Sequence, residues 1–343
     1  MPLLKLGPVH VEYEQHGAGQ PFLLLHSLLT EMTVFDVMLP KLTGHLTRIN
    51  LPGFGASTPV ELNTVAAHAD HVARVIHALK LPSDTAVFGN GFGSFVALEL
   101  AIRHGKRFGK LIVADTLTAF PEKARVPFRV MAEKVSAGGM KAVLDTAIDR
   151  MFPPAFAQAH PDIIADRKAK LSAVDPQCFA RACLALATLN LSSNAANIEN
   201  RTLVLCGALD QTTPPALARE LSQRIKGSRY AEIPNSGHCP MLEQPDILAE
   251  HILAFIADQR RFDGRLDRFG VAETADRQAR RGQPDQLQHR SHRQDGGAAP
   301  TRTRGARANR RCGGAGGSRT ARRRHGRPGC RGPFACACPW ACG

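Results

Sequence analysis

The chain has 343 residues and a formal net charge of +14, from 44 basic and 30 acidic side chains. Eighteen arginines, no lysine and five acidic residues fall in residues 264–343, which leaves residues 1–263 with a net charge of +1. Residues 1–263, called the body below, are near neutral, which excludes a large basic surface for nucleic acid on this part of the chain. The whole chain is 43% apolar, which excludes a protein that is disordered over its full length.

Short apolar runs alternate with helical patterns along the body. The first two runs lie close enough for an antiparallel hairpin, and several later runs are apolar throughout, as parallel strands covered on both faces are. Strands are expected, in chain order, at residues 3–6, 9–14, 22–26, 46–50, 85–89, 111–115, 202–206 and 229–233, and helices at residues 63–80, 94–104, 214–226 and 246–258. This alternation predicts an α/β fold with a mostly parallel central sheet and flanking helices.

One interval breaks the alternation. Residues 118–198 contain helical patterns, clearest at 131–152 and 176–189, but no convincing strand. An all-helical insertion between two parallel strands is typical of a cap over a ligand site. We therefore expect a core from residues 1–117 and 199–263, and a helical cap from residues 118–198.

The apolar periodicity ends after about residue 263. Residues 264–343 hold 14 of the 30 glycines and bury too little apolar surface to offset the entropy of ordering, so we expect a disordered Arg/Gly-rich tail. Three origins stay open: a nucleic-acid-binding arm, a neutral extension, and a GC-rich gene read out of frame. Arginine, glycine, alanine and proline without lysine favour the third origin.

The N-terminal sequence and the cysteines indicate a cytoplasmic protein. The first residues lack the pattern of a signal peptide, and no apolar run approaches the roughly 20 residues that span a bilayer. Four of the nine cysteines lie in the body, without the even framework of a secreted disulfide-rich domain. We expect no membrane association and no nucleic-acid partner for the body, and the sequence makes no prediction of oligomeric state.

The turns after the predicted strands carry the residues that could take part in binding or catalysis. In open α/β sheets, ligands bind beyond the carboxyl ends of the strands. These turns hold His26-Ser27-Leu28, Gly89-Asn90-Gly91-Phe92-Gly93, Asp210 and His238, in chain order. A buried carboxylate at Asp210 would hold the tautomer of an imidazole at His238 and stabilise the imidazolium, which makes a general base. Asp115, also at a strand end, is the second candidate for the acid.

This order of turns resembles the α/β-hydrolase fold family over residues 9–258, and within it the 3-oxoadipate enol-lactonase branch of ester, lactone and carbon–carbon bond hydrolases. The motifs that carry the resemblance are His26-Ser27-Leu28-Leu29-Thr30, PGFGAS at residues 52–57, Gly139-Met140, Asp175-Pro176 and the Thr-Pro-Pro after Asp210. The resemblance implies Asp210 as the acid, His238 as the base, and the backbone N–H groups of Phe92 and Leu28 as an oxyanion hole. The sequence itself has no phosphate-binding loop and no evident metal cluster, so we expect no cofactor and no metal.

The nucleophile position departs from the family pattern. The family has Gly-x-Ser-x-Gly at this turn, and here Gly91 stands where the serine should be. Because glycine adopts the strained turn at little steric cost, the backbone and the oxyanion donors should survive without the hydroxyl. Ser27, Ser94 and Cys239 are weaker candidates for a replacement nucleophile, and Ser27 is expected more as a polar contact to substrate.

Three functions remain open on this basis. We favour a hydrolase in which the His238–Asp210 dyad activates water, or the substrate itself, in the space that the missing serine leaves. The alternatives are a catalytically inactive protein that binds a small ligand and a serine hydrolase disabled at Gly91. The resemblance favours a small carboxylate-bearing ester, enol-lactone or diketone-like substrate, and Arg129, Arg150 or Arg181 of the cap would suit its carboxylate.

Overall fold

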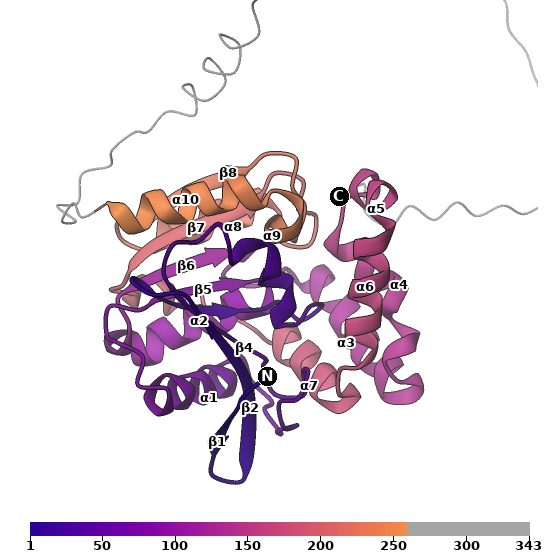
Figure 1. Cartoon of the computed structure of the whole chain (residues 1–343). Coiled ribbons are helices and arrows are strands. Elements are labelled where there is room, and N and C mark those ends of the chain that lie inside the picture. The colour runs from indigo at the N-terminus through magenta and orange to yellow at the C-terminus, as the bar shows by residue number, and fades with distance from the viewer. Residues whose placement is uncertain (259–343) are drawn as a thin grey trace, which may run out of the picture. The chain divides into compact units, whose positions relative to one another are not determined.

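One mostly parallel sheet organises the part of the chain that the computed structural model describes, residues 1–258 (Figure 1). The predicted tail at residues 264–343 lies outside the described residues. The strands are β1 (Leu3–Leu6), β2 (Val9–His16), β3 (Pro21–Leu25), β4 (His45–Ile49), β5 (Ala86–Asn90), β6 (Lys110–Ala114), β7 (Arg201–Gly207) and β8 (Arg229–Ile233). Every predicted strand is confirmed to within two residues at each end.

The strand order is β1-β2-β4-β3-β5-β6-β7-β8. Strands β1 and β2 form the predicted antiparallel hairpin, β2 pairs antiparallel with β4, and β3 to β8 are parallel. Every residue of β3 and β5 is buried, which explains why these strands are continuous apolar runs. The carboxyl ends of β3, β5, β7 and β8 consequently lie along the same edge of the sheet.

Helices flank the sheet as the sequence predicts. They are α1 (Val65–Ala78), α2 (Phe92–His104), α8 (Pro215–Arg224), α9 (Pro240–Glu243) and α10 (Pro245–Ala257). Each except α9 matches a predicted helix, and α9 is a single turn too short for a periodic pattern. None of the described helices is long and apolar enough to cross a bilayer.

The interval between β6 and β7 contains five α-helices, short 3₁₀ turns and one isolated bridge between Ala119 and Asn190. The helices are α3 (Glu122–Gly138), α4 (Leu144–Met151), α5 (Pro154–Ala159), α6 (Pro161–Ser172) and α7 (Pro176–Ala187), grouped at the right of Figure 1. The helical pattern expected across residues 131–152 is two helices, because the chain turns at Gly139, whose φ of +68° ends α3.

These helices contact the turns at the carboxyl edge of the sheet directly. The amide of His238 donates to the carbonyl of Met151 at 3.0 Å, and the amide of Asp175 donates to the carbonyl of Gly53 at 2.8 Å. The helical segment therefore covers the edge where the predicted site residues lie.

Candidate active site

The turn after β5 has the backbone of a nucleophile elbow. Gly91 precedes the first residue of α2 with φ +52° and ψ −117°, a conformation that is strained for residues with a side chain. A Cβ on Gly93 would lie 2.2 Å from the carbonyl oxygen of Leu25, so only glycine lets α2 approach β3 this closely. The glycines thus place the free N–H groups at the start of α2 over the edge of the sheet.

Asp210 and His238 form a buried hydrogen-bonded pair. The Oδ2 atom of Asp210 lies 2.8 Å from Nδ1 of His238. The carboxylate also accepts from the backbone amides of Thr212 and Thr213, at 2.7 and 3.1 Å, and from the Thr213 hydroxyl at 2.6 Å. Burial raises the pKa of Asp210, but the charge of His238 and the hydrogen bonds outweigh burial and lower the pKa below its ordinary value.

The imidazole of His238 is poised to accept a proton. Burial lowers the pKa of His238, but the Asp210 carboxylate outweighs burial and raises the pKa above its ordinary value of 6.5. Because Nδ1 donates to Asp210, the neutral ring has a lone pair on Nε2, and no hydrogen bond from residues 1–258 occupies that atom. The pair can therefore act as a general base on a hydroxyl group in the pocket.

Asp115, the second candidate for the acid, makes no hydrogen bond to the imidazole. Its carboxyl accepts from the Asn90 side-chain amide at 2.7 Å and from the backbone amide of Gly207 at 2.8 Å. Burial and the nearby Asp210 charge raise the pKa of Asp115 well above its ordinary value, which favours the neutral acid.

One oxygen or nitrogen each of Asp115, Asp210 and His238 lies within 4.8 Å of the others, a spacing that a metal ion can use. The carboxyl groups are already engaged, however, by the backbone, by Asn90 and by Thr213. These contacts suit a hydrogen-bonded acid–base pair better than a metal site.

His26 shapes the loop after β3. The amide of Leu51 donates to Nε2 of His26 at 3.0 Å, so Nδ1 carries the proton and donates to the carbonyl of Ser27 at 2.8 Å. Burial lowers the pKa of His26 to about 4, which keeps the ring neutral. The amide of Ser27 donates to the Thr30 hydroxyl oxygen at 3.1 Å. Both backbone groups of Ser27 are therefore held in place.

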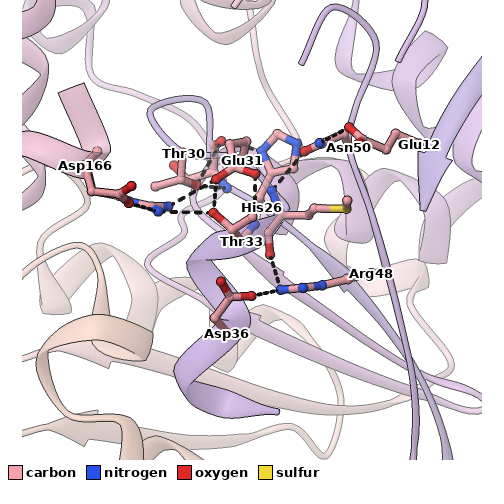
Figure 2. Close-up of polar contacts among 12 residues, drawn as sticks. Glu12, His26, Thr30, Glu31, Thr33, Asp36, Arg48, Asn50 and Asp166 are labelled. Atoms are coloured by element: carbon pink, nitrogen blue, oxygen red, sulfur yellow. Dashed lines mark hydrogen bonds and ion pairs between the residues drawn. The ribbon is translucent and has the colours of Figure 1, made fainter. Parts of the chain in front are cut away.

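The same loop is tied to the helical segment above it, and Figure 2 shows this polar network around His26, Thr30 and Glu31. Arg167 of α6 lies 3.4 Å from the Glu31 carboxylate and donates to the Thr33 hydroxyl at 3.1 Å, besides pairing with Asp166. Arg167 and Glu31 are each only 6% exposed. Because breaking a buried ion pair leaves a charge without compensation, this contact fixes α6 on the loop.

Two backbone N–H groups are available beside the base. The amides of Phe92 and Leu28 donate no hydrogen bond to any group in residues 1–258, and both residues line the same pocket as His238. Phe92 is the first residue of α2, where the helix itself supplies no acceptor. Two such groups beside a base could stabilise a negative oxygen, so the oxyanion hole that the resemblance implies stays a prediction for Phe92 and Leu28.

The pocket holds about 350 Å³ of space between atoms, part of it open to solvent. Its lining is mostly apolar and comprises Ser27, Leu28, Leu29, Gly91, Phe92, Phe95, Phe120, Phe128, Met131, Arg150, Leu186, Thr212, Thr213 and His238. Arg150 stacks over the Phe128 ring at 5.2 Å and forms no ion pair with any described residue. Its guanidinium is therefore a free positive charge in an apolar pocket.

The structure does not bring the other two cap arginines to the pocket. Arg129, which we expected to bind substrate, lies on the exposed side of α3 and pairs with Glu122 at 3.0 Å. Arg181 pairs with Glu61 and donates to Asn63 at 3.1 Å. The expectation for Arg129 was wrong because the sequence does not show which face of α3 turns inward.

The structure also separates the candidates for a replacement nucleophile. Ser94 is fully buried and its hydroxyl donates to the carbonyl of Gly91 at 2.6 Å, so it supports the turn from beneath. Cys239 is fully buried, and burial raises the pKa of its thiol well above the ordinary value. Ser27 alone of these three lines the pocket.

The space beside His238 is not empty, contrary to our expectation. A Cβ on Gly91 would lie 2.3 Å from Oγ of Ser27, so the Ser27 side chain takes the volume that a serine at position 91 would fill. The reason is the sheet order: β3 and β5 are neighbours, which sets the turns that follow them side by side. Without a side chain at position 91, nothing competes with Ser27 for this volume.

Three supporting residues were not predicted from the sequence. Thr213 orients Asp210, Arg167 holds the loop after β3, and Glu243 accepts from the amides of Gly237 and Cys239 on either side of His238. The threonine and the glutamate stand three and five residues after the acid and the base, so local spacing carries a weak signal for both. Arg167 carries none, because its partner is 136 residues away.

A family model described as "Alpha/beta hydrolase family" matches residues 16–251. The chain belongs to the alpha/beta hydrolase family. A family relative, 3-oxoadipate enol-lactonase 2 of Acinetobacter baylyi, is 29% identical over 194 residues, which cover 56% of this chain and 71% of the relative. A pimeloyl-(acyl-carrier protein) methyl ester esterase of Nitrosospira multiformis is 25% identical over 265 residues, covering 73% of this chain and 99% of the esterase.

A solved structure confirms the predicted fold. The enol-lactonase from Burkholderia xenovorans LB400 superimposes with a TM-score of 0.69 at 24% identity, over 75% of this chain and 100% of that chain. The chain also matches a polyketide synthase, ThaQ of Burkholderia thailandensis, at 28% identity over 267 residues, but spans only 13% of that protein's length. The resemblance to the enol-lactonase branch is thus confirmed at the level of family and fold.

Proposed function

We propose that this protein hydrolyses small activated esters or lactones that carry a carboxylate, with the His238–Asp210 pair as the general base. The observation that carries the proposal is the 2.8 Å contact between Nδ1 of His238 and Asp210, in a pocket that also presents two free backbone N–H groups. A base and an oxyanion hole are the two parts that acyl hydrolysis needs besides a nucleophile.

The chemistry follows from these positions. Nε2 of His238 takes the proton of the attacking hydroxyl group, and Asp210 stabilises the imidazolium that forms. The amides of Phe92 and Leu28 stabilise the negative oxygen of the tetrahedral intermediate. His238 then gives its proton to the departing alkoxide or enolate, and the oxygen of a water that His238 has activated ends in the acid product.

The lining of the pocket defines the substrate class. The walls are aromatic and aliphatic, and Arg150 is the one pocket residue whose side chain is a permanent cation. A short acyl chain ending in a carboxylate fits both features. The enol-lactonase and the methyl ester esterase among the relatives support an ester or lactone as the reacting group. Four buried free cysteines in residues 1–258 fit a cytoplasmic setting, and the proposal requires no cofactor or macromolecular partner.

A panel of p-nitrophenyl esters and small lactones, each with and without a terminal carboxylate, tests the proposal. We expect turnover that is faster for the carboxylate members. Arg150→Gln should raise KM at least tenfold for those members and leave the neutral members unchanged, and the matched variant Arg129→Gln should change neither. Binding of the same compounds without turnover would contradict the proposal and identify a non-catalytic binding protein.

A further inference from the structure

We propose that Ser27, from the loop after β3, is the nucleophile that attacks the substrate in place of a serine at position 91. The inference rests on the proposed function, because it adds a first, covalent step to the same hydrolysis. It starts from the finding that Ser27 takes the volume of the missing side chain.

The side chains of Ser27 and His238 approach each other beside Gly91. The position that a Cβ on Gly91 would occupy lies 2.3 Å from Oγ of Ser27 and 2.9 Å from Nε2 of His238. The two atoms cannot be further apart than the sum of these distances. They do not form a hydrogen bond with each other, and catalytic contacts of this kind are often long until substrate binds.

The surroundings of Ser27 suit a reacting group. Its amide and its carbonyl are held by Thr30 and His26, so the backbone that carries the side chain is fixed on both sides. The residue as a whole is only 2% exposed, yet its Oγ has no hydrogen-bond partner in residues 1–258 and is not among the buried polar atoms that lack one. The hydroxyl group is therefore reached from the pocket that Ser27 lines, where it is free to contact a substrate.

The oxyanion donors are also in the right place for attack from Ser27. Leu28 is the next residue in the chain, and Phe92 follows Gly91, whose absent side chain Ser27 replaces. Both residues line the pocket with Ser27. A carbonyl carbon that bonds to Oγ of Ser27 would therefore have its oxygen beside the two amide N–H groups.

The two steps balance without any further reagent. Oγ of Ser27 bonds to the acyl carbon while its proton moves to Nε2 of His238, and the bond to the alcohol breaks as that proton passes to the leaving oxygen. A water then attacks the acyl group on Ser27 and gives a proton to His238. The bond to Ser27 breaks, and the serine oxygen takes that proton back.

The test combines labelling with kinetics on the full-length chain. The protein is treated with a fluorophosphonate, digested with trypsin and analysed by mass spectrometry, and hydrolysis of a p-nitrophenyl ester is measured in parallel. Ser27 is the only serine between Lys5 and Lys41, so an adduct on a serine of that peptide identifies it. Ser27→Ala is the loss variant, Ser27→Cys retains a nucleophile, and Ser94→Ala controls for the nearest other serine on the turn.

We expect an adduct on the 6–41 peptide of the wild-type chain. Ser27→Ala should lose the adduct and at least 100-fold in kcat/KM, and its melting temperature should stay unchanged because the hydroxyl makes no internal hydrogen bond. Ser27→Cys should keep measurable turnover and react with iodoacetamide at residue 27, and Ser94→Ala should keep the adduct.

Equal hydrolysis by the wild-type chain and Ser27→Ala, with no adduct, would overturn the inference and leave the proposed function intact, with water as the direct nucleophile. An adduct on another residue would also overturn it. Hydrolysis by neither protein, with no adduct, would contradict both proposals.

Discussion

The turns after β7 and β8 keep every group that a general base needs, whereas the turn after β5 keeps only its backbone. Asp210 is held by four hydrogen bonds and points at His238, while Gly91 has the conformation of the elbow and no side chain. The conformation of the elbow depends on contacts of neighbouring glycines with backbone atoms, which a change at position 91 does not touch. The comparison teaches that the fold holds the Asp210–His238 pair and the free N–H groups of Leu28 and Phe92 in place without a side chain at position 91.

The largest expected effect separates the two aspartates on the acid–base side. Asp210→Asn removes the charge that fixes the imidazole, and kcat/KM for a p-nitrophenyl ester should fall on the order of 10³- to 10⁴-fold. Asp115→Asn replaces a carboxyl group whose pKa burial and the Asp210 charge raise, and which makes no hydrogen bond to His238, so the fall should stay within about threefold. Equal losses in the two variants would contradict the assignment of Asp210.

A second expected effect concerns the support of the loop that carries Ser27. Arg167→Met leaves the buried Glu31 without its cation, and the free energy of unfolding should fall by about 3–5 kcal/mol. Arg181→Met, in the same helical segment, breaks a partly exposed pair with Glu61 and should cost about 1 kcal/mol or less. Urea unfolding measures both values, and a loss no larger for Arg167→Met than for Arg181→Met would show that the contact does not fix the loop.

A third prediction tests whether a serine at position 91 fits the turn after β5 while Ser27 is present. Gly91→Ser alone puts a Cβ 2.3 Å from Oγ of Ser27, and crowding of this kind costs about 1–3 kcal/mol. The double variant Gly91→Ser with Ser27→Gly removes the clash and should exceed the single variant about 10- to 100-fold in kcat/KM. If the single variant is as active as the double, Ser27 does not occupy the nucleophile's volume.

The pH dependence should be the smallest of these effects. His238 acts as a base only when neutral, and its pKa is raised above 6.5, so kcat/KM should rise with pH along a limb whose midpoint lies above 6.5. In Asp210→Asn the carboxylate no longer opposes burial, so the midpoint of the residual activity should move to lower pH. A midpoint that does not move between the two proteins would show that another group titrates.

The sequence could indicate the pairing of Asp210 with His238, because its signals are local. Asp210 and His238 each follow an apolar strand at its carboxyl end, and the parallel sheet brings such ends together whatever the details of packing. The glycines around Gly91 likewise indicated the elbow.

What the sequence could not show depends on long-range packing. The filling of the elbow by Ser27 follows from two strands being neighbours in the sheet, and the Arg167–Glu31 pair joins residues 136 positions apart. The choice of Arg150 over Arg129 depends on how α3 and α4 are each rotated about their axes. The sequence does not fix that rotation, because α3 has Pro127 in its interior and α4 has only eight residues.

The most direct test of the account compares the wild-type chain with His238→Ala on one chromogenic ester. Removal of the general base should lower kcat/KM about 10²- to 10⁴-fold, while Gly91 stays as it is in both proteins. If both proteins are folded and neither hydrolyses the ester faster than buffer without protein, the claim that this fold hydrolyses esters without a serine at position 91 is contradicted.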